Sequence, residues 1–363
     1  MQSEDGPDRL WADLHKVILE GEPVQEVRIP ESRMFVWPGV HVECGENIRV
    51  LAPDTLRVFL ITDKPCIPIA RHVAMSLQQN RFDVSGGVAP ATKGPAKAAT
   101  LSQLQAKLDA VGKNGVTVVA VGGTAVMHLG MRLTGSRPLF LVPSTMRSQL
   151  DVSVGGACCP AFAGRWRPPK AVFSDPTLLR ELPLREYVAG LAEAVKCAIV
   201  QDSDFFDFLD THSRQIRDRD QNTLEELVFR GATVKSAAIS TATPGPGARA
   251  TLRYGHWVGG SLERFAGSAI LHGEALAVGM EAEAALAQRL GWANGELIQK
   301  QNRLLKAMGL PTRIKGLPAE KLALPLLANG TPKPDLPDSV GHTRGPAEAT
   351  SPLIKAAIAA VTK

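Results

Sequence analysis

The chain has 363 residues, of which 44% are hydrophobic and 21% are charged, and it carries a formal net charge of +5 with a pI near 9.0. This composition excludes a disordered chain, and the length suffices for two domains that each bury a core. The positive charge is mild and spread along the chain, so it favours a small anionic ligand in a pocket and argues against nucleic acid.

Membrane and disulfide signals are weak throughout the sequence. No run of about 18 apolar residues occurs, and the polar, acidic N-terminus lacks the features of a signal peptide. The five cysteines include no C-x-x-C pair and do not form a disulfide framework. We therefore expect no membrane association and a reducing cytoplasmic location.

The first half of the chain alternates strand and helix signals. Short apolar runs predict buried strands over residues 56–62, 115–121 and 138–143, and amphipathic spacing predicts helices over 67–79 and 100–111. This alternation is typical of a parallel sheet with helices on both faces. Residues 1–178 are therefore predicted to form an α/β, Rossmann-like nucleotide-binding domain.

The second half changes to one helix after another. The predicted helices cover residues 184–199, 203–211, 222–241, 256–265, 272–290, 294–308 and 351–363. Pro and Gly cluster between 329 and 346, which indicates a loop. We expect residues 179–363 to form an all-helical domain that binds metal and substrate, with the boundary near 174–182 where prolines interrupt the pattern.

Three residues in this second half suggest a divalent-metal site. Glu193 lies in the run GLAEAVK, His256 in LRYGHW and His272 in LHGEALAVGM. One carboxylate and two imidazoles leave a coordination position open for water or substrate, as in catalytic zinc sites. Each residue alone has an ordinary structural explanation, but both histidines adjoin glycines in a chain with only eight histidines.

The same segments carry a family resemblance. The runs Asp151-Val-Ser-Val-Gly-Gly156 and Gly190-Leu-Ala-Glu-Ala-Val-Lys196, then Lys235, Arg249 and Leu271-His-Gly-Glu274, follow one another in that order. Together they resemble the dehydroquinate synthase family, the sugar phosphate cyclases. The resemblance is strongest between residues 140 and 280.

The resemblance implies roles for several residues. Zinc or cobalt would bind to Glu193, His256 and His272. The substrate's hydroxyls and carboxylate would be held by Asp151, Lys196, Lys235 and Arg249. Members of the family are commonly homodimers, so a homodimer acting on a small anionic sugar-like substrate is expected.

A nicotinamide cofactor site is predicted at the turn after the strand over residues 115–121. Glycines at 122 and 123 allow a pyrophosphate to approach the backbone at the start of a helix. The family binds NAD with a Gly-Gly-Gly-x-x-Gly-Asp run here, whereas this chain lacks the third and fourth glycines and the acidic residue. The candidate NAD contacts are Asp63, Lys97, Gly122, Gly123 and Thr145.

The part of the site that would hold a phosphate group departs from the family. Ala157 occupies the position of a lysine, and Gly260 that of a second histidine. Two explanations stay open. Either the substrate carries no phosphate there, or arginines bind it by another geometry. The candidate arginines are Arg165, Arg167 and Arg253.

These departures lead to three hypotheses for function. The first is a diverged sugar phosphate cyclase, a metal-dependent carbon-oxygen lyase that forms a carbocycle in a specialised pathway such as antibiotic biosynthesis rather than in housekeeping dehydroquinate synthesis. The second is a metal- and NAD-dependent polyol dehydrogenase of the same fold. The third is a repurposed member that works without NAD or has altered catalysis.

Overall fold

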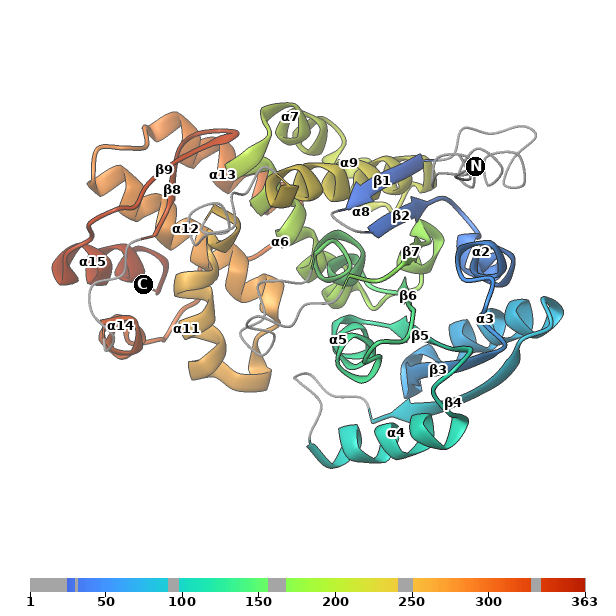
Figure 1. Ribbon diagram of the computed structural model, residues 1–363. Helices are drawn as coiled ribbons and strands as arrows, with labels where there is room; N and C mark the ends of the chain where they lie inside the picture. The colour runs from blue at the N-terminus through green and yellow to red at the C-terminus, as the bar shows by residue number, and fades with distance from the viewer. Residues whose placement is uncertain are drawn as a thin grey trace, which may run out of the picture. The chain divides into compact units, whose positions relative to one another are not determined.

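The chain divides into two compact units, described here from a computed structural model (Figure 1). The structure describes residues 25–29, 32–90, 98–155, 168–240, 251–327 and 334–362. The first unit contains the described residues up to Ser144 together with 168–177, and the second contains the rest. The domain limits 1–178 and 179–363 stay a prediction, although residues 145–155, which carry Asp151, pack with the second unit.

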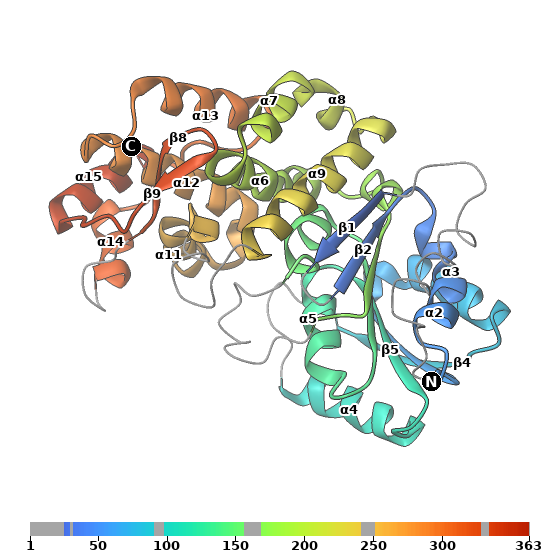
Figure 2. The same cartoon turned by 45° about the horizontal axis from the view of Figure 1, so that its top comes forward.

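The first unit is built on a seven-stranded sheet with the order β1-β2-β7-β6-β5-β3-β4. Its strands are β1 (Gln25–Ile29), β2 (Ser32–Val36), β3 (Arg57–Asp63), β4 (Asp83–Ala89), β5 (Val116–Gly122), β6 (Leu139–Pro143) and β7 (Ala171–Ser174). Strand β1 pairs antiparallel to β2, and all other neighbours are parallel. The hairpin of β1 and β2 stands out in the rotated view (Figure 2).

Helices cover both faces of this sheet, as the alternating apolar runs predict. They are α2 (Cys44–Leu51), α3 (Ile67–Gln79), α4 (Ala98–Val111) and α5 (Thr124–Leu133). Val119 and Val121 pack in one cluster with side chains of α2 and α3. The residue between them, Ala120, faces α5, where Gly130 lets the helix approach so closely that an added Cβ would lie 2.7 Å from the Ala120 Cβ. The α/β class with a parallel sheet is confirmed.

The strand order changes direction between β3 and β5. Strands β3 and β5 are neighbours, while β4 lies beyond β3 and β6 lies beyond β5. Parallel sheets bind ligands outside the carboxyl ends of the strands where the connections diverge in this way. Asp63 ends β3 and Gly122 ends β5, so two of the predicted cofactor residues lie at this point.

The second unit is mainly helical. Its helices are α6 (Leu184–Gln201), α7 (Ser203–Thr211), α8 (Ser213–Arg217), α9 (Gln221–Ser240), α11 (His256–Ala266), α12 (His272–Arg289), α13 (Gly295–Ala307), α14 (Ala319–Leu327) and α15 (Ser351–Thr362). A hairpin of β8 (Leu336–Ser339) and β9 (His342–Arg344) adds a small antiparallel sheet, so this unit is not all-helical. These strands are too short to show a periodicity, and Pro337 makes the sequence of the first strand resemble that of a loop.

Helix α12 forms the centre of the second unit. Its sequence, HGEALAVGMEAEAALAQR, is rich in small residues, and most of its side chains are buried. It packs against α6, α11, α13 and α15. A helix covered on so many sides needs apolar or small residues around its whole circumference. Among the helices of the described residues, none is long and apolar enough to cross a membrane.

Candidate metal centre and substrate site

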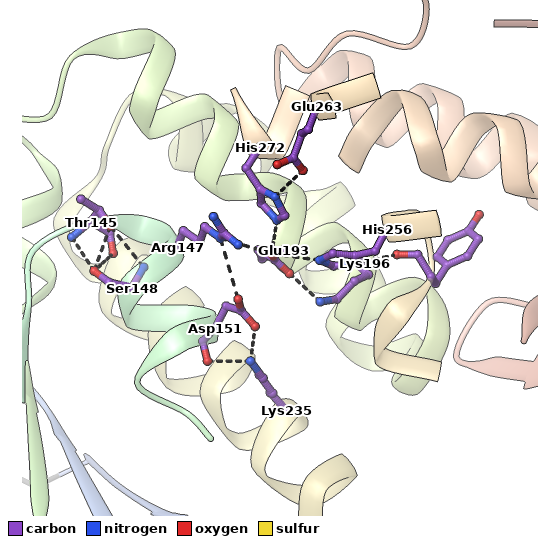
Figure 3. A network of polar contacts seen from close by, with 11 residues as sticks. Thr145, Arg147, Ser148, Asp151, Glu193, Lys196, Lys235, His256, Glu263 and His272 are labelled. Carbon is purple, nitrogen blue, oxygen red and sulfur yellow. Dashed lines mark hydrogen bonds and ion pairs between the residues drawn. The ribbon is translucent and has the colours of Figure 1, made fainter. Parts of the chain in front are cut away.

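The three predicted metal ligands converge within the second unit (Figure 3). Glu193 lies on α6, while His256 and His272 are the first residues of α11 and α12. One ligand atom from each residue lies within 4.8 Å of the other two. The Glu193 Oε1 is 3.1 Å from the His272 Nε2 and 3.8 Å from the His256 Nε2. This one-oxygen, two-nitrogen set fits an open tetrahedral site for a divalent cation.

Glycine residues allow the helices that carry these ligands to pack closely. A Cβ added to Gly273, the neighbour of His272, would lie 1.6 Å from the carbonyl oxygen of Ala189 on α6. A Cβ added to Gly279 would lie 2.0 Å from the carbonyl oxygen of Gly255, just before α11. Both contacts are with backbone, which cannot move aside as a side chain can. The run His-Gly-Glu is therefore tied to helix packing as well as to metal chemistry.

A buried carboxylate holds the start of α11, the helix that begins with His256. Gly255 has a φ of 75° in the left-handed region, which suits glycine. The Glu283 carboxylate on α12 accepts hydrogen bonds from the backbone N–H groups of Gly255 and Val258, at 2.8 and 3.0 Å. Burial raises the pKa of Glu283 to about 7 in spite of these bonds. This contact orients His256, and nothing in the local sequence predicts it.

The electrostatic setting prepares two of the ligands to bind a cation. Burial raises the pKa of Glu193, but Lys196 and His272 outweigh it, and the net pKa lies well below the usual range, so the carboxylate is ionised. Burial and nearby Lys196 lower the pKa of His256 to about 3, so its imidazole is neutral. An ionised carboxylate and a neutral imidazole are the protonation states that metal binding requires.

Glu263 on α11 is a fourth acidic residue at this centre, and the sequence does not single it out. Its Oε1 lies 2.7 Å from the Nδ1 of His272. With Nδ1–H bonded to this carboxylate, a neutral His272 ring would offer the Nε2, which lies 3.1 Å from the Glu193 Oε1, to a metal ion. Carboxylate partners of this kind fix the tautomer and ring orientation of metal-binding histidines.

The predicted substrate residues Asp151, Lys196 and Lys235 also meet at this centre. Asp151 lies on a π-helical turn, Ser148–Val152, a geometry common at functional sites. The Lys235 Nζ contacts the Asp151 carboxylate and lies 2.6 Å from its carbonyl oxygen. The Lys196 Nζ lies 2.5 Å from the Glu193 Oε2. Both lysines are almost fully buried.

Burial of these charges is offset by their pairing. Burial and Glu193 raise the pKa of Asp151, but the cations Lys235, Lys196 and Arg147 lower it by more. The net pKa is therefore below the usual value, and the carboxylate is ionised. Buried charges cost several kcal/mol each unless paired. A set of paired, buried ions beside a candidate metal centre is more typical of catalysis than of stabilisation.

Arg147 is a second residue that the sequence does not single out. It precedes the π-helical turn and points into the same cluster (Figure 3). Its Nε lies 3.7 Å from the Glu193 Oε1 and 3.9 Å from the Asp151 Oδ2. Only the four-residue spacing to Asp151 in the sequence hints at this position.

The remaining predicted site residues are divided between the units or fall outside the description. In the first unit, Asp63 accepts a hydrogen bond from the Cys66 N–H, and Gly122 and Gly123 join β5 to α5. In the second unit, the Thr145 Oγ1 lies 2.9 Å from the Ser148 Oγ. The following positions lie outside the described residues: Lys97, Ala157, Arg165, Arg167 and Arg249.

Comparisons with known proteins agree with this geometry. Residues 190–329 match a family model described as 3-dehydroquinate synthase C-terminal. A 3-dehydroquinate synthase of Symbiobacterium thermophilum is 31% identical over 298 residues, covering 77% of this chain and 82% of that protein. One of Desulforamulus reducens is 33% identical over 274 residues, covering 71% of this chain and 76% of that protein.

Solved structures share the fold at lower identity. ValA, a 2-epi-5-epi-valiolone synthase of Streptomyces hygroscopicus subsp. jinggangensis with NAD+ and Zn2+ bound, is 19% identical with a TM-score of 0.79, covering 94% of this chain and 99% of its own. A 2-deoxy-scyllo-inosose synthase in complex with carbaglucose-6-phosphate, NAD+ and Co2+ is 20% identical with a TM-score of 0.80, covering 93% of this chain and 99% of its own. With curated relatives above 30% identity over most of their length, the chain belongs to the dehydroquinate synthase family of sugar phosphate cyclases.

Proposed function

We propose that this chain is a metal-dependent sugar phosphate cyclase that forms a carbocycle in a specialised pathway and does not serve dehydroquinate synthesis. The observation that carries the catalytic part is the meeting of Glu193, His256 and His272 with two buried lysines in one cluster. The specialised substrate is supported by the changes at Ala157 and Gly260. A role in antibiotic biosynthesis and a homodimeric state stay predictions.

The donor set fits a resident divalent ion such as zinc or cobalt. Its carboxylate is ionised and His256 is neutral, and two solved structures with this fold hold Zn2+ or Co2+. The ligands would be Glu193, His256 and His272. A bound ion supplies Lewis acidity to a substrate hydroxyl.

The first unit fits a nicotinamide cofactor at the edge formed by β3 and β5. Gly123 leads directly into α5 with no side-chain cap, so the start of this helix suits a pyrophosphate. Asp63 ends the neighbouring strand, and both solved structures named above hold NAD+. NAD would accept a hydride from the substrate and return it.

The buried charges suggest how the chain's own residues act. Lys196 and Lys235 present ammonium groups held by Glu193 and Asp151, so a substrate hydroxyl or enolate oxygen that approaches them meets preorganised donors. The Asp151 carboxylate is ionised and can hold a hydroxyl proton. The pairing orients the donors before the substrate arrives, which reduces reorganisation during the reaction.

Dehydroquinate synthesis is the second candidate, because the curated relatives carry that name. The deciding experiment supplies the metal- and NAD-loaded protein with a panel of heptulose and hexose phosphates, including the shikimate-pathway heptulosonate phosphate. Phosphate release and ring formation are followed by NMR. We expect turnover of another sugar phosphate at least about 100-fold faster than of the heptulosonate phosphate, a ratio that two charge-assisted contacts made only to the preferred substrate would give. Preferred turnover of the heptulosonate phosphate would establish the second candidate.

Glu263 provides a test of the metal site that does not depend on turnover. Glu263→Ala removes the carboxylate that orients His272, and we expect zinc affinity to fall about 10- to 100-fold. Glu263→Gln keeps an oxygen that can accept the bond from Nδ1–H and should lose less. Competition with a chromophoric chelator measures both affinities. Equal affinity in Glu263→Ala and the unmodified chain would show that His272 needs no such partner.

A further inference from the structure

The guanidinium of Arg147 lies at the metal centre within ion-pair distance of two carboxylates, but its Nε makes no hydrogen bond to either. Its distances to Glu193 and Asp151, 3.7 and 3.9 Å, exceed the usual reach of a hydrogen bond. Its Nε is buried and donates no hydrogen bond within the described part of the chain. A buried N–H donor without a partner is costly, so a group that binds there would be favoured.

Arg147 also lies on the accessible side of the cluster. Its side chain is 31% exposed, whereas those of Glu193 and Lys196 are 1% exposed and that of Lys235 is 2% exposed. A ligand that enters from solvent can therefore reach the guanidinium before it reaches the lysines. His256 and His272, at 22% and 16%, lie between these extremes.

The charge balance of the cluster favours an anionic ligand. Among the described residues, the cationic side chains of the cluster are those of Arg147, Lys196 and Lys235, and its carboxylates are those of Asp151, Glu193 and Glu263. These charges cancel, so a divalent cation held by neutral histidines leaves the cluster with a net charge of +2. A partly buried excess of positive charge is relieved by a dianion, and a phosphate group close to neutral pH carries about that charge.

We infer that Arg147 binds the phosphate group of the substrate, and this inference rests on the proposed function. The guanidinium offers Nε and a terminal nitrogen as a fork that matches two phosphate oxygens. Arg147 thereby contributes a charge-assisted contact in a chain that has Ala157 and Gly260 at the positions of a lysine and a histidine in the family. It holds the group that sugar phosphates share, while Lys196 and Lys235 address the hydroxyl groups.

The probe is inorganic phosphate, titrated into the zinc-loaded chain by calorimetry. We expect Arg147→Leu to weaken phosphate binding at least tenfold while it keeps one zinc per chain. Arg147→Lys keeps the charge but not the fork, and it should bind phosphate with intermediate affinity. Circular dichroism checks that each variant is folded. Arg289→Leu, which changes an exposed arginine at the end of α12 that donates to the Ala285 carbonyl oxygen, is the matched control and should bind as the unmodified chain does.

Several outcomes would overturn the inference. Unchanged phosphate binding in folded, zinc-loaded Arg147→Leu would reduce Arg147 to a balancing charge for Glu193 and Asp151. If Arg147→Leu fails to fold, unchanged phosphate binding in Arg147→Gln, which removes the charge but keeps a polar side chain, would do the same. Acetate that displaces phosphate at equal ionic strength would replace phosphate by a carboxylate as the ligand.

The inference and the proposed function can fail separately. If the unmodified chain turns over a sugar phosphate and Arg147→Leu keeps its KM, Arg147 is not the phosphate contact, although the cyclase assignment stands. If no sugar phosphate is turned over but phosphate binding still depends on Arg147, the anion site stands and the cyclase assignment fails.

Discussion

Replacing His272 with alanine is expected to abolish stoichiometric metal binding. Of the two histidine ligands, His272 has its Nε2 nearer to the Glu193 carboxylate, at 3.1 Å against 3.8 Å for His256, and its ring is held on the other side by Glu263. Loss of one of three protein ligands removes several kcal/mol of binding free energy, so the zinc dissociation constant should rise by about 1000-fold or more. Elemental analysis after dialysis, with chelator competition for the affinity, measures the effect.

The control for this change is His342→Ala, because His342 is exposed in the β8–β9 hairpin and pairs with Asp338. That variant should keep one zinc per chain. Full zinc content in His272→Ala would refute the assignment of this histidine as a ligand. A loss of zinc in both variants would indicate general unfolding, which circular dichroism would reveal.

Replacing Lys235 with methionine is expected to reduce turnover by at least about 100-fold, because it removes a preorganised donor to a substrate oxygen. The change conserves volume, but it also affects stability, because Lys235 is buried and pairs with Asp151. Breaking a buried ion pair by removing one partner costs about 3–5 kcal/mol, so the melting temperature should fall as well.

A double variant separates the two effects of Lys235. In Lys235→Met with Asp151→Asn, the unpaired buried charge is gone, so part of the lost stability should return while turnover stays low. Lys300→Met, an exposed lysine on α13 paired with Glu296, is the control and should match the unmodified chain. Turnover of Lys235→Met within threefold of the unmodified chain would return Lys235 to a purely structural role.

Regular elements with strong periodicity could be predicted from the sequence. The helix expected over residues 67–79 is observed as Ile67–Gln79, and the one expected over 203–211 as Ser203–Thr211. The short strands β8 and β9 were not predicted, because four or three residues carry no readable period. The π-helical turn at Ser148–Val152 was also missed, since its geometry depends on tertiary packing around Asp151.

The residues of the candidate site also differ in whether the sequence predicts them. Glu193, His256 and His272 could be named because their segments carry short, distinctive runs. Arg147, Glu263 and Glu283 could not be named. Arg147 and Glu263 lie in local sequences without a distinctive run, and Glu283 acts on residues that are distant in the sequence. Glu283 contacts the start of α11 from 25 and 28 residues away, a relation that no local pattern encodes.

The metal centre itself is tested most directly by crystals grown with zinc and measured on both sides of the zinc absorption edge. The account predicts one strong anomalous peak per chain in the second unit, within coordination distance of Glu193, His256 and His272, at about 2.0–2.2 Å from the ligand atoms. Zinc bound only by other residues, with no anomalous peak between these three side chains, would contradict the account.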